Sequence, residues 1–159
     1  MTNNLISKRT IVFIAGKFDP IHDGHLEHII KASKLGDTLV IITHSDAIIA
    51  KTSSKKKCFI PEWARILILK GIMKELKIRG WVKLSIDEDG TITKTLEETI
   101  NRLRPDLTTD WTFILAKGGD RTPDNMPESE IKVCRDLGIE IKYGIGDLLN
   151  SSSKITSKI

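Results

Sequence analysis

The sequence lacks the features that disulfide-rich, zinc-binding and membrane-spanning proteins need. Its two cysteines, Cys58 and Cys134, lie far apart without metal-ligand partners at a useful spacing, which argues against a disulfide framework or a zinc site. No apolar run approaches the length of a membrane span, and the N-terminus has no apolar core of a signal peptide. These absences favour a protein of a reducing compartment, the cytoplasm, without a membrane partner.

Aromatic residues make up only 5% of the chain, and none is interleaved with the basic residues in a way that would stack bases. We therefore expect no nucleic-acid partner. The formal net charge of +4 is unevenly spread, because Lys51, Lys55, Lys56 and Lys57 crowd one segment. Such a run is commonly a solvated loop, but it also suits a polyphosphate ligand.

The residues that are present predict one globular domain spanning residues 1–159. The length allows a sizeable core. Hydrophobic residues at 40% and charged residues at 29% are in the balance that globular domains show. Residues 1–8 are mostly polar, so we expect them to be flexible.

A strand, a tight turn and a helix start are predicted around Gly16–Leu26. The apolar run 10–15 precedes this stretch, and the helix-like run 26–35 follows it. His22 and His25 stand three residues apart on one side of the helix start, where free N–H groups and the helix dipole favour an anion. Gly24 has no side chain to keep a phosphate from the backbone. We interpret the stretch as a phosphate site with histidine donors; the alternative is a capped turn with two surface histidines.

Apolar strands and amphipathic helices alternate along the whole chain with short links. In the helix that Pro61 opens, Arg65 is expected to face away from the buried side, which comprises Ala64, Leu67, Ile68, Ile72 and Leu76. The alternation predicts an α/β fold: a Rossmann-like, doubly wound sheet of five parallel strands in the order 3-2-1-4-5, with helices on both faces. The predicted strands are 10–15, 38–43, 81–86, 111–116 and 139–143, and the predicted helices are 26–35, 61–76, 93–104 and 128–137; residues 45–57 are expected to be a loop with a short helical turn.

Two polar, glycine-rich segments should meet at one edge of this sheet. Ligands of such sheets bind beyond the carboxyl ends of the strands, where the strand order reverses. In the predicted order this point lies between the first and fourth strands. The first leads into the His22–His25 turn, and the fourth leads into Lys117-Gly118-Gly119-Asp120. We therefore expect one crevice that holds a phosphorylated ligand.

These motifs resemble those of the cytidylyltransferase-like nucleotidyltransferases. The segment Gly16-x-Phe18-Asp19-Pro20-x-His22-x-Gly24-His25 resembles their nucleotide-binding signature. Within that superfamily the chain is most similar to the adenylyltransferase of the ADP-heptose pathway. Further similarities follow in that family's order at residues 36–47, 86–89, 103–106 and 117–120. The segment Ser151-Ser152-Ser153-Lys154-Ile155 resembles the Ser-Thr-Thr motif that opens the family's last helix.

The resemblance implies nucleotidyl transfer, in which an acceptor phosphate attacks the α-phosphorus of a nucleoside triphosphate and pyrophosphate leaves. His22 and His25 would be catalytic, together with Lys51 or Lys55 as a positive charge. Mg²⁺ would come with the triphosphate, ATP or CTP, and no side chain is assigned as a metal ligand. Asp19 is also expected to fix the turn. The implied nucleotide-binding residues are Gly16, Lys17, Phe18, His22, Gly24, His25, Lys117, Gly119, Asp120, Ser151, Ser152 and Ser153, and the implied substrate-binding residues are Asp19, Arg65 and Arg121.

The acceptor and the base stay open at this point. Arg121 stands where the resembled family usually has an aromatic residue, and Leu107–Asp110 are extra residues before the fourth strand. The leading hypothesis is an adenylyltransferase acting on a sugar phosphate of the heptose 1-phosphate type. The alternatives are a glycerol- or polyol-phosphate cytidylyltransferase, a pantetheine-phosphate or FAD-type adenylyltransferase, and a non-catalytic nucleotide-binding protein. Members of the family often form dimers, so a homodimer is among the expected assemblies.

Overall fold

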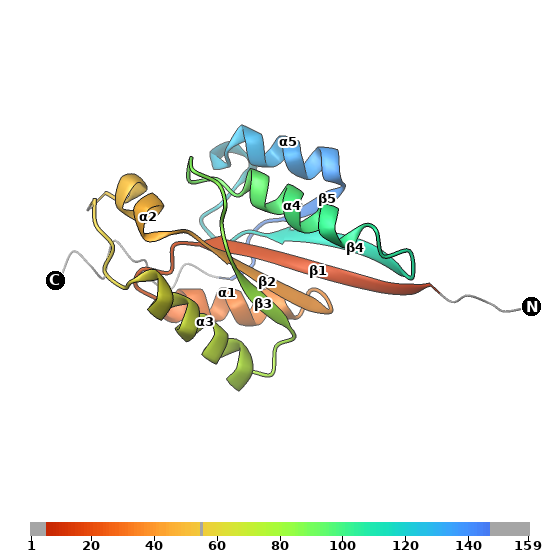
Figure 1. The fold of residues 1–159 in the computed structure, drawn as a ribbon, viewed down its shortest axis with the longest axis horizontal. Helices are drawn as coiled ribbons and strands as arrows, with labels where there is room; N and C mark the ends of the chain where they lie inside the picture. The colour runs from red at the N-terminus through yellow and green to blue at the C-terminus, as the bar shows by residue number, and fades with distance from the viewer. Residues whose placement is uncertain (1–5, 55, 147–159) are drawn as a thin grey trace, which may run out of the picture.

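The computed structural model describes residues 6–54 and 56–146 and shows an α/β fold (Figure 1). Five parallel strands form one sheet in the order β3-β2-β1-β4-β5, which confirms the predicted topology. The strands are β1 (Ser7–Gly16), β2 (Thr38–Thr43), β3 (Gly80–Leu84), β4 (Thr109–Ala116) and β5 (Ile139–Lys142). The helices are α1 (Asp23–Ser33), α2 (Asp46–Thr52), α3 (Glu62–Glu75), α4 (Thr93–Leu103) and α5 (Glu128–Leu137), with a short 3-10 turn η1 (Pro123–Asn125).

Helices cover both faces of the sheet, with α1 and α3 on one face and α4 and α5 on the other (Figure 1). The central strand β1 sends alternate side chains to opposite faces. Ile11 and Phe13 pack in the cluster with α4 and α5, whereas Val12 and Ile14 pack in the cluster with α1 and α3. Because both faces are covered, the buried parts of β1 and β2 are apolar almost without interruption.

The strand β1 begins at Ser7, within the segment 1–8 that was expected to be flexible. Ser7 pairs with Thr109 and Lys8 pairs with Asp110, so the start of β1 is held by the start of β4. The extra residues before the predicted fourth strand therefore lengthen the β1–β4 ladder at its amino end. That end lies opposite the carboxyl ends of the strands, away from Lys117.

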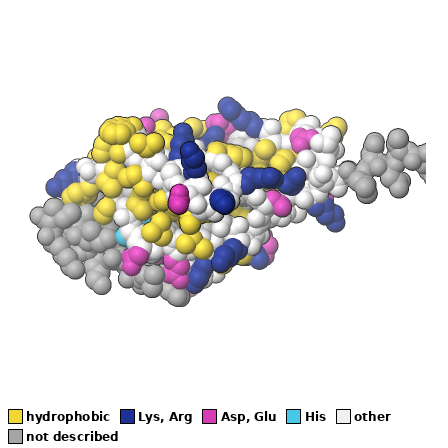
Figure 2. Space-filling view, turned by 90° about the horizontal axis from the view of Figure 1, so that it is seen from below, with side chains coloured by type: hydrophobic (Ala, Val, Ile, Leu, Met, Phe, Trp, Pro, Cys, Tyr) yellow, Lys and Arg dark blue, Asp and Glu magenta, His cyan; other side chains and the backbone are white. Residues whose placement is uncertain are grey.

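The predicted buried face of the helix after Pro61 is wrong for three of its five residues, although Ile72 does pack against the core. Leu67 is 62% exposed, and Ile68 and Leu76 are also exposed, whereas Arg65 is 0% exposed and packs inward with Leu69 and Met73. Apolar residues occur on every side of α3, so their spacing alone does not select a face. Figure 2 shows apolar side chains gathered on the face of the molecule that carries α1 and α3.

No helix in the described part of the chain has both the length and the apolar character that crossing a membrane requires.

Candidate active site

A cavity of about 450 Å³ opens at the carboxyl edge of the sheet. Its lining comes from the turn after β1, the residues after β2 and the loop after β4, so the two predicted segments do meet in one cavity. The end of β1, the turn after it and the start of α1 contribute Gly16, Lys17, Phe18, Asp19 and His25 but neither His22 nor Gly24, and the loop after β4 contributes Lys117, Asp120 and Arg121.

His22 and His25 form a reciprocal cap at the start of α1. The backbone N–H of Gly24 donates to His22 Nδ1 at 3.1 Å, and the backbone N–H of His22 donates to His25 Nδ1 at 3.3 Å. Each neutral ring therefore carries its hydrogen on Nε2. The two rings stack with their centroids 3.8 Å apart. The cap thus fixes two Nε2–H donors side by side.

Both imidazoles are neutral at pH 7. Burial lowers the pKa of His22, although Asp23 nearby raises it. Burial, followed by the nearby His22 and His28, lowers the pKa of His25 to about 3. A ring that resists protonation is a poor base but a good hydrogen-bond donor, so the pair is suited to the oxygens of a phosphate.

The backbone between Gly16 and Asp19 is strained. Phe18 has a φ of +53°, a left-handed conformation that is uncommon for a bulky residue and that clusters at functional sites. Its ring is 1% exposed and lies 4.8 Å from the ring of His25. A Cβ at Gly16 would come within 3.2 Å of the Phe18 ring, so glycine suits this place. Because the Phe18 ring is buried in the core, this residue can offer a ligand its backbone only.

Gly24 does not have the free N–H group that was expected. Its N–H donates to His22 Nδ1 and also to Asp23 Oδ1 at 3.0 Å. The capping interaction therefore uses the group that a phosphate would otherwise bind.

Asp19 fixes the segment that follows α2. Its carboxylate is 7% exposed and accepts the N–H groups of Phe59, at 2.9 and 3.0 Å, and of Ile60, at 2.6 Å. The sequence predicted that Asp19 fixes its own turn; the carboxylate instead holds the segment before α3. The carboxylate is occupied by the chain itself, so its assignment as a substrate-binding residue is not favoured.

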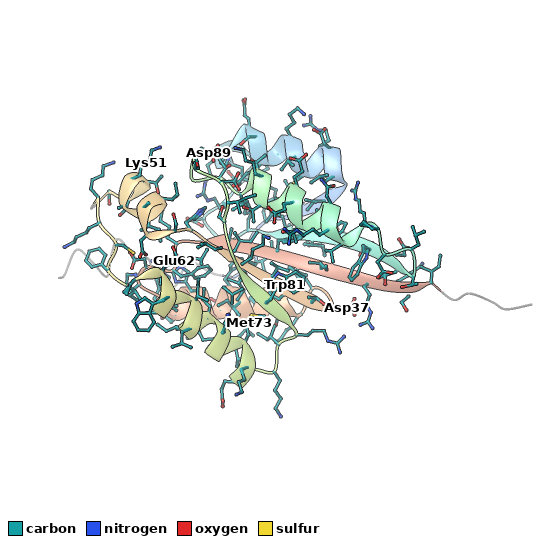
Figure 3. All side chains as sticks on the ribbon, viewed as in Figure 1. Asp37, Lys51, Glu62, Met73, Trp81 and Asp89 are labelled. Carbon is teal, nitrogen blue, oxygen red and sulfur yellow. The ribbon has the colours of Figure 1, made fainter. Side chains whose placement is uncertain are left out.

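The described lysines between residues 51 and 57 do not line the cavity. Lys51 is exposed on α2 (Figure 3). Lys56 Nζ donates to the carbonyl oxygen of Lys51, and Lys57 Nζ lies 4.7 Å from the centre of the Phe59 ring. Lys55 lies outside the described residues. The prediction that Lys51 supplies a positive charge to the site is therefore not supported by its position.

Lys17 is the lysine that the turn itself places at the cavity. Burial lowers its pKa, Lys56 lowers it further, and Asp19 raises it. From the sequence, only the backbone of Lys17 was expected to contact a phosphate. The position of Lys17 within the Gly16–His25 segment was the signal that its side chain could also contact a phosphate.

Lys117 and Glu130 form a largely buried ion pair at the wall of the cavity. Lys117 Nζ lies 3.3 Å from Glu130 Oε2, and Ile92 N–H donates to Glu130 Oε1 at 3.1 Å. Asp120 and Arg121 line the exposed rim, where Arg121 Nη1 donates to the carbonyl oxygen of Asn125 at 2.9 Å. Gly119 lies in the same loop but is not part of the lining. Glu130 was missed because an acidic residue in an amphipathic helix gives no local sign that it faces inward.

Arg65 is a buried structural residue that does not line the cavity, which corrects its predicted solvent exposure and does not favour its assignment to substrate binding. Its Nη1 donates to Asp46 Oδ1 at 2.9 Å and to the carbonyl oxygen of Ile60 at 2.6 Å. Its Nη2 donates to the carbonyl oxygen of His44 at 2.5 Å. The guanidinium group therefore ties the end of β2 to the segment before α3. The predicted triphosphate ligands Ser151, Ser152 and Ser153 lie outside the described residues.

Comparison with known proteins gives sequence relatives named bifunctional protein HldE. The bifunctional protein HldE of Syntrophotalea carbinolica is 37% identical over 118 residues, which are 74% of this chain and 21% of that protein. HldE of Pelobacter propionicus is 35% identical over 123 residues, which are 77% of this chain and 22% of that protein. The chain thus spans about a fifth of the length of these curated relatives.

Solved structures share the fold. The lipopolysaccharide core biosynthesis protein of Thermoplasma volcanium has a TM-score of 0.56 at 25% identity, over 86% of this chain and 94% of that chain. The bifunctional NMN adenylyltransferase/ADP ribose pyrophosphatase of Francisella tularensis, solved with AMP and a manganese ion, has a TM-score of 0.60 at 14% identity, over 94% of this chain and 41% of that chain. The family model described as cytidylyltransferase-like matches residues 13–145. The chain therefore belongs to the cytidylyltransferase-like family and is a nucleotidyltransferase.

Proposed function

We propose that this nucleotidyltransferase joins ATP to a sugar 1-phosphate of the heptose type and releases pyrophosphate. The observation that carries the proposal is the cavity in which His25, Lys17 and the loop after β4 come together. The choice of acceptor is supported by the motifs that resemble the ADP-heptose adenylyltransferase and by the 37% identity to a protein named HldE. The similarity to a lipopolysaccharide core biosynthesis protein agrees with a sugar acceptor.

In the proposed reaction an oxygen of the acceptor phosphate forms a bond to the α-phosphorus of the triphosphate. The bond from that phosphorus to the bridging oxygen breaks, and pyrophosphate leaves with the electron pair. The attacking oxygen is already ionised, so no general base is required. His22 and His25 donate from Nε2 to the phosphoryl oxygens, on which negative charge must be stabilised in the transition state.

Cationic side chains at the cavity would balance the charge of the two substrates. Lys17 lines the cavity and Arg121 lies at its rim, so we assign these two the role that the sequence assigned to Lys51. Lys117 also lines the cavity, but Glu130 already balances its charge, so we assign it a polar contact to the nucleotide only. For Lys55 and for Ser151–Ser153 the roles implied by the resemblance stay proposals: a charge near the phosphates and hydroxyl contacts to the β- and γ-phosphates. Asp120, also at the rim, would accept hydrogen bonds from hydroxyl groups of the ribose or of the acceptor.

A divalent cation would enter with the triphosphate. Within residues 6–54 and 56–146, no three side chains of metal-binding types come together in a way that could hold an ion. We propose that Mg²⁺ is held by phosphate oxygens and water, where it screens part of the triphosphate charge. A Francisella structure with the same fold holds a manganese ion and AMP, which is consistent with a nucleotide-bound divalent cation.

Arg121 favours a second candidate. A cationic side chain at the rim, in place of the aromatic residue of the resembled family, alters the surroundings of the acceptor. The second candidate is a cytidylyltransferase that uses CTP and a glycerol or polyol phosphate.

The full chain would be incubated with ATP or CTP and, in turn, a heptose 1-phosphate, glycerol 3-phosphate, nicotinamide mononucleotide or phosphopantetheine. Pyrophosphate release would be followed by a coupled assay, and each product would be identified by mass. We expect the highest kcat/KM for ATP with the heptose 1-phosphate. A highest value for CTP with glycerol 3-phosphate would establish the second candidate instead. Triphosphate binding without pyrophosphate release in any combination would contradict both. Sedimentation of the same sample would test the expected homodimer.

A further inference from the structure

His44 is a buried imidazole that lines the cavity and has no part in the mechanism above. It directly follows β2, is 6% exposed, and its Nδ1 is buried without a hydrogen-bond partner among the described residues. Most buried polar atoms in native structures do have a partner. An apolar side chain would fill this place without leaving a polar atom unsatisfied, so packing alone does not explain an imidazole here.

The position of His44 is fixed by contacts from two directions. Arg65, which is 0% exposed, donates from Nη2 to the carbonyl oxygen of His44 at 2.5 Å. The preceding residue, Thr43, donates from Oγ1 to the carbonyl oxygen of Lys17 at 3.3 Å and so joins the end of β2 to the turn after β1. The backbone at His44 is therefore fixed, and the ring is 6% exposed, so the side chain needs little ordering when a ligand binds.

The hydrogen of the His44 ring lies on Nε2. Burial is the largest influence and lowers the pKa of His44; Lys17 and Arg65 also lower it, while Glu130 and Asp87 raise it, so the ring is neutral at pH 7. A neutral imidazole carries one N–H. In proteins, a buried N–H without an acceptor is rarer than a buried acceptor without a donor. We therefore assign the unpartnered Nδ1 as the nitrogen without a hydrogen. His44 then offers one N–H donor, as His22 and His25 do.

The side of the sheet on which His44 lies indicates which substrate it meets. The strand order reverses between β1 and β4, and the nucleotide is expected there. His44 follows β2, on the opposite side of β1, where the cavity is also lined by Ile49 and Ser53. Lys17 lines the same cavity, and the bond from Thr43 to its carbonyl oxygen joins the turn that carries it to the end of β2. An N–H donor beside an ammonium group is suited to a phosphate oxygen.

We propose that His44, together with Lys17, binds the phosphate group of the acceptor, with His44 donating from Nε2 to an oxygen that does not attack. The inference rests on the proposed function, in which the acceptor is a phosphate ester. It separates three imidazoles by role: His22 and His25 act on the phosphorus that is attacked, and His44 holds the group that attacks.

Steady-state kinetics of His44→Leu and His44→Asn test the proposal. In His44→Leu the KM for the acceptor should rise about ten-fold, as expected for the loss of one hydrogen bond to an ionised group. The dissociation constant of a non-hydrolysable triphosphate, measured by calorimetry, should stay close to that of the wild type. His44→Asn keeps an N–H donor and should recover part of the affinity for the acceptor. His28→Gln is the matched control, because His28 does not line the cavity, and its acceptor KM should not change.

Two results would overturn the proposal: a His44→Leu variant with an unchanged acceptor KM, or one that loses triphosphate affinity alone. If His44→Leu does not fold, the same comparison is made with His44→Phe, which also lacks an N–H donor, and a wild-type acceptor KM in that variant would overturn the proposal.

An NMR titration of the wild-type chain with inorganic phosphate separates this proposal from the proposed function. The Nε2 signal of His44 should shift and saturate, and Lys17→Met should weaken the binding. If no substrate pair releases pyrophosphate, the proposed function fails, yet a saturating shift would still support a phosphate site at His44. A His44 signal that does not respond to phosphate would overturn the site even if the enzyme is active.

Discussion

The carboxylate of Asp19 and the backbone N–H of Phe59, forty residues apart in the sequence, are joined by contacts of 2.9 and 3.0 Å. The same carboxylate accepts the N–H of Ile60 at 2.6 Å. One side chain of the histidine turn therefore positions the segment between α2 and α3. Because Ser53 and Ser54 of that segment line the cavity, the contact also shapes the site.

Asp19→Ala should release this segment. Hydrogen bonds to an ionised group contribute about 1.5–3 kcal/mol each, so amide exchange at Phe59 and Ile60 should be faster by at least one decade. Hydrogen exchange followed by NMR would measure this. Asp136→Ala, which removes an exposed carboxylate on α5, is the control and should leave both amides unchanged. Unchanged exchange at Phe59 in Asp19→Ala would show that the segment is held by other contacts.

His25→Ala and His22→Ala should each lower kcat by two to three decades. Loss of one oriented transition-state donor costs about 3–4 kcal/mol. His22→Ala should in addition lose about 1 kcal/mol of stability, because His22 caps α1. Pyrophosphate release gives kcat, and circular dichroism verifies that the variants fold. If both variants turned over within a factor of a few of the wild type, the histidines would not be the donors.

Acid should destabilise the protein through His25. Its pKa in the folded state is about 3, against about 6.5 for an unperturbed histidine. Between these values the unfolded chain binds a proton that the folded chain does not, so stability is fully present above pH 6.5 and falls as the pH is lowered towards 3. The free energy of unfolding of the wild type should drop, relative to His25→Gln, by about 1.4 kcal/mol for each pH unit in this window. Urea unfolding at several pH values would measure both chains; parallel pH profiles would contradict a neutral, buried His25.

The sheet and the histidine turn could be predicted because their signals are local. The strands β1 and β2 are buried on both faces, which leaves continuous apolar runs such as Ile11–Ile14 in the sequence. The turn needs Gly16 because a Cβ there would crowd the Phe18 ring. A glycine required by a close neighbour in the chain can be recognised in the sequence. Parallel topology then brought the turn and the Lys117 loop together without any further information.

The rest of the site could not be predicted, because its signals lie in other parts of the chain. Arg65 is buried because Asp46, Ile60 and the carbonyl of His44 surround its guanidinium group, and no spacing within α3 reveals these partners. Glu130 faces inward because it accepts from Ile92 and pairs with Lys117, which come from other elements. Lys51 belongs to a dense run of positive charge in the sequence, yet it lies on the exposed side of α2, whereas Ile49 of that helix lines the cavity.

Arg65→Met should destabilise the fold by about 3 kcal/mol or more. The substitution keeps much of the side-chain volume but leaves the carbonyl oxygens of His44 and Ile60 without their donor, and each buried polar group left unsatisfied costs about 1–3 kcal/mol. Urea unfolding would measure the change.

Arg102→Ala is the matched control, because that arginine pairs with Glu98 on the surface of α4 and its side chain is 76% exposed. Its loss should change the free energy of unfolding by about 0.5 kcal/mol or less. Because Arg65 also holds the backbone of His44, a folded fraction of Arg65→Met should bind the acceptor less tightly than Arg102→Ala does. Equal unfolding free energies in the two variants would mean that the bonds of Arg65 to the end of β2 and to the segment before α3 do not stabilise the fold.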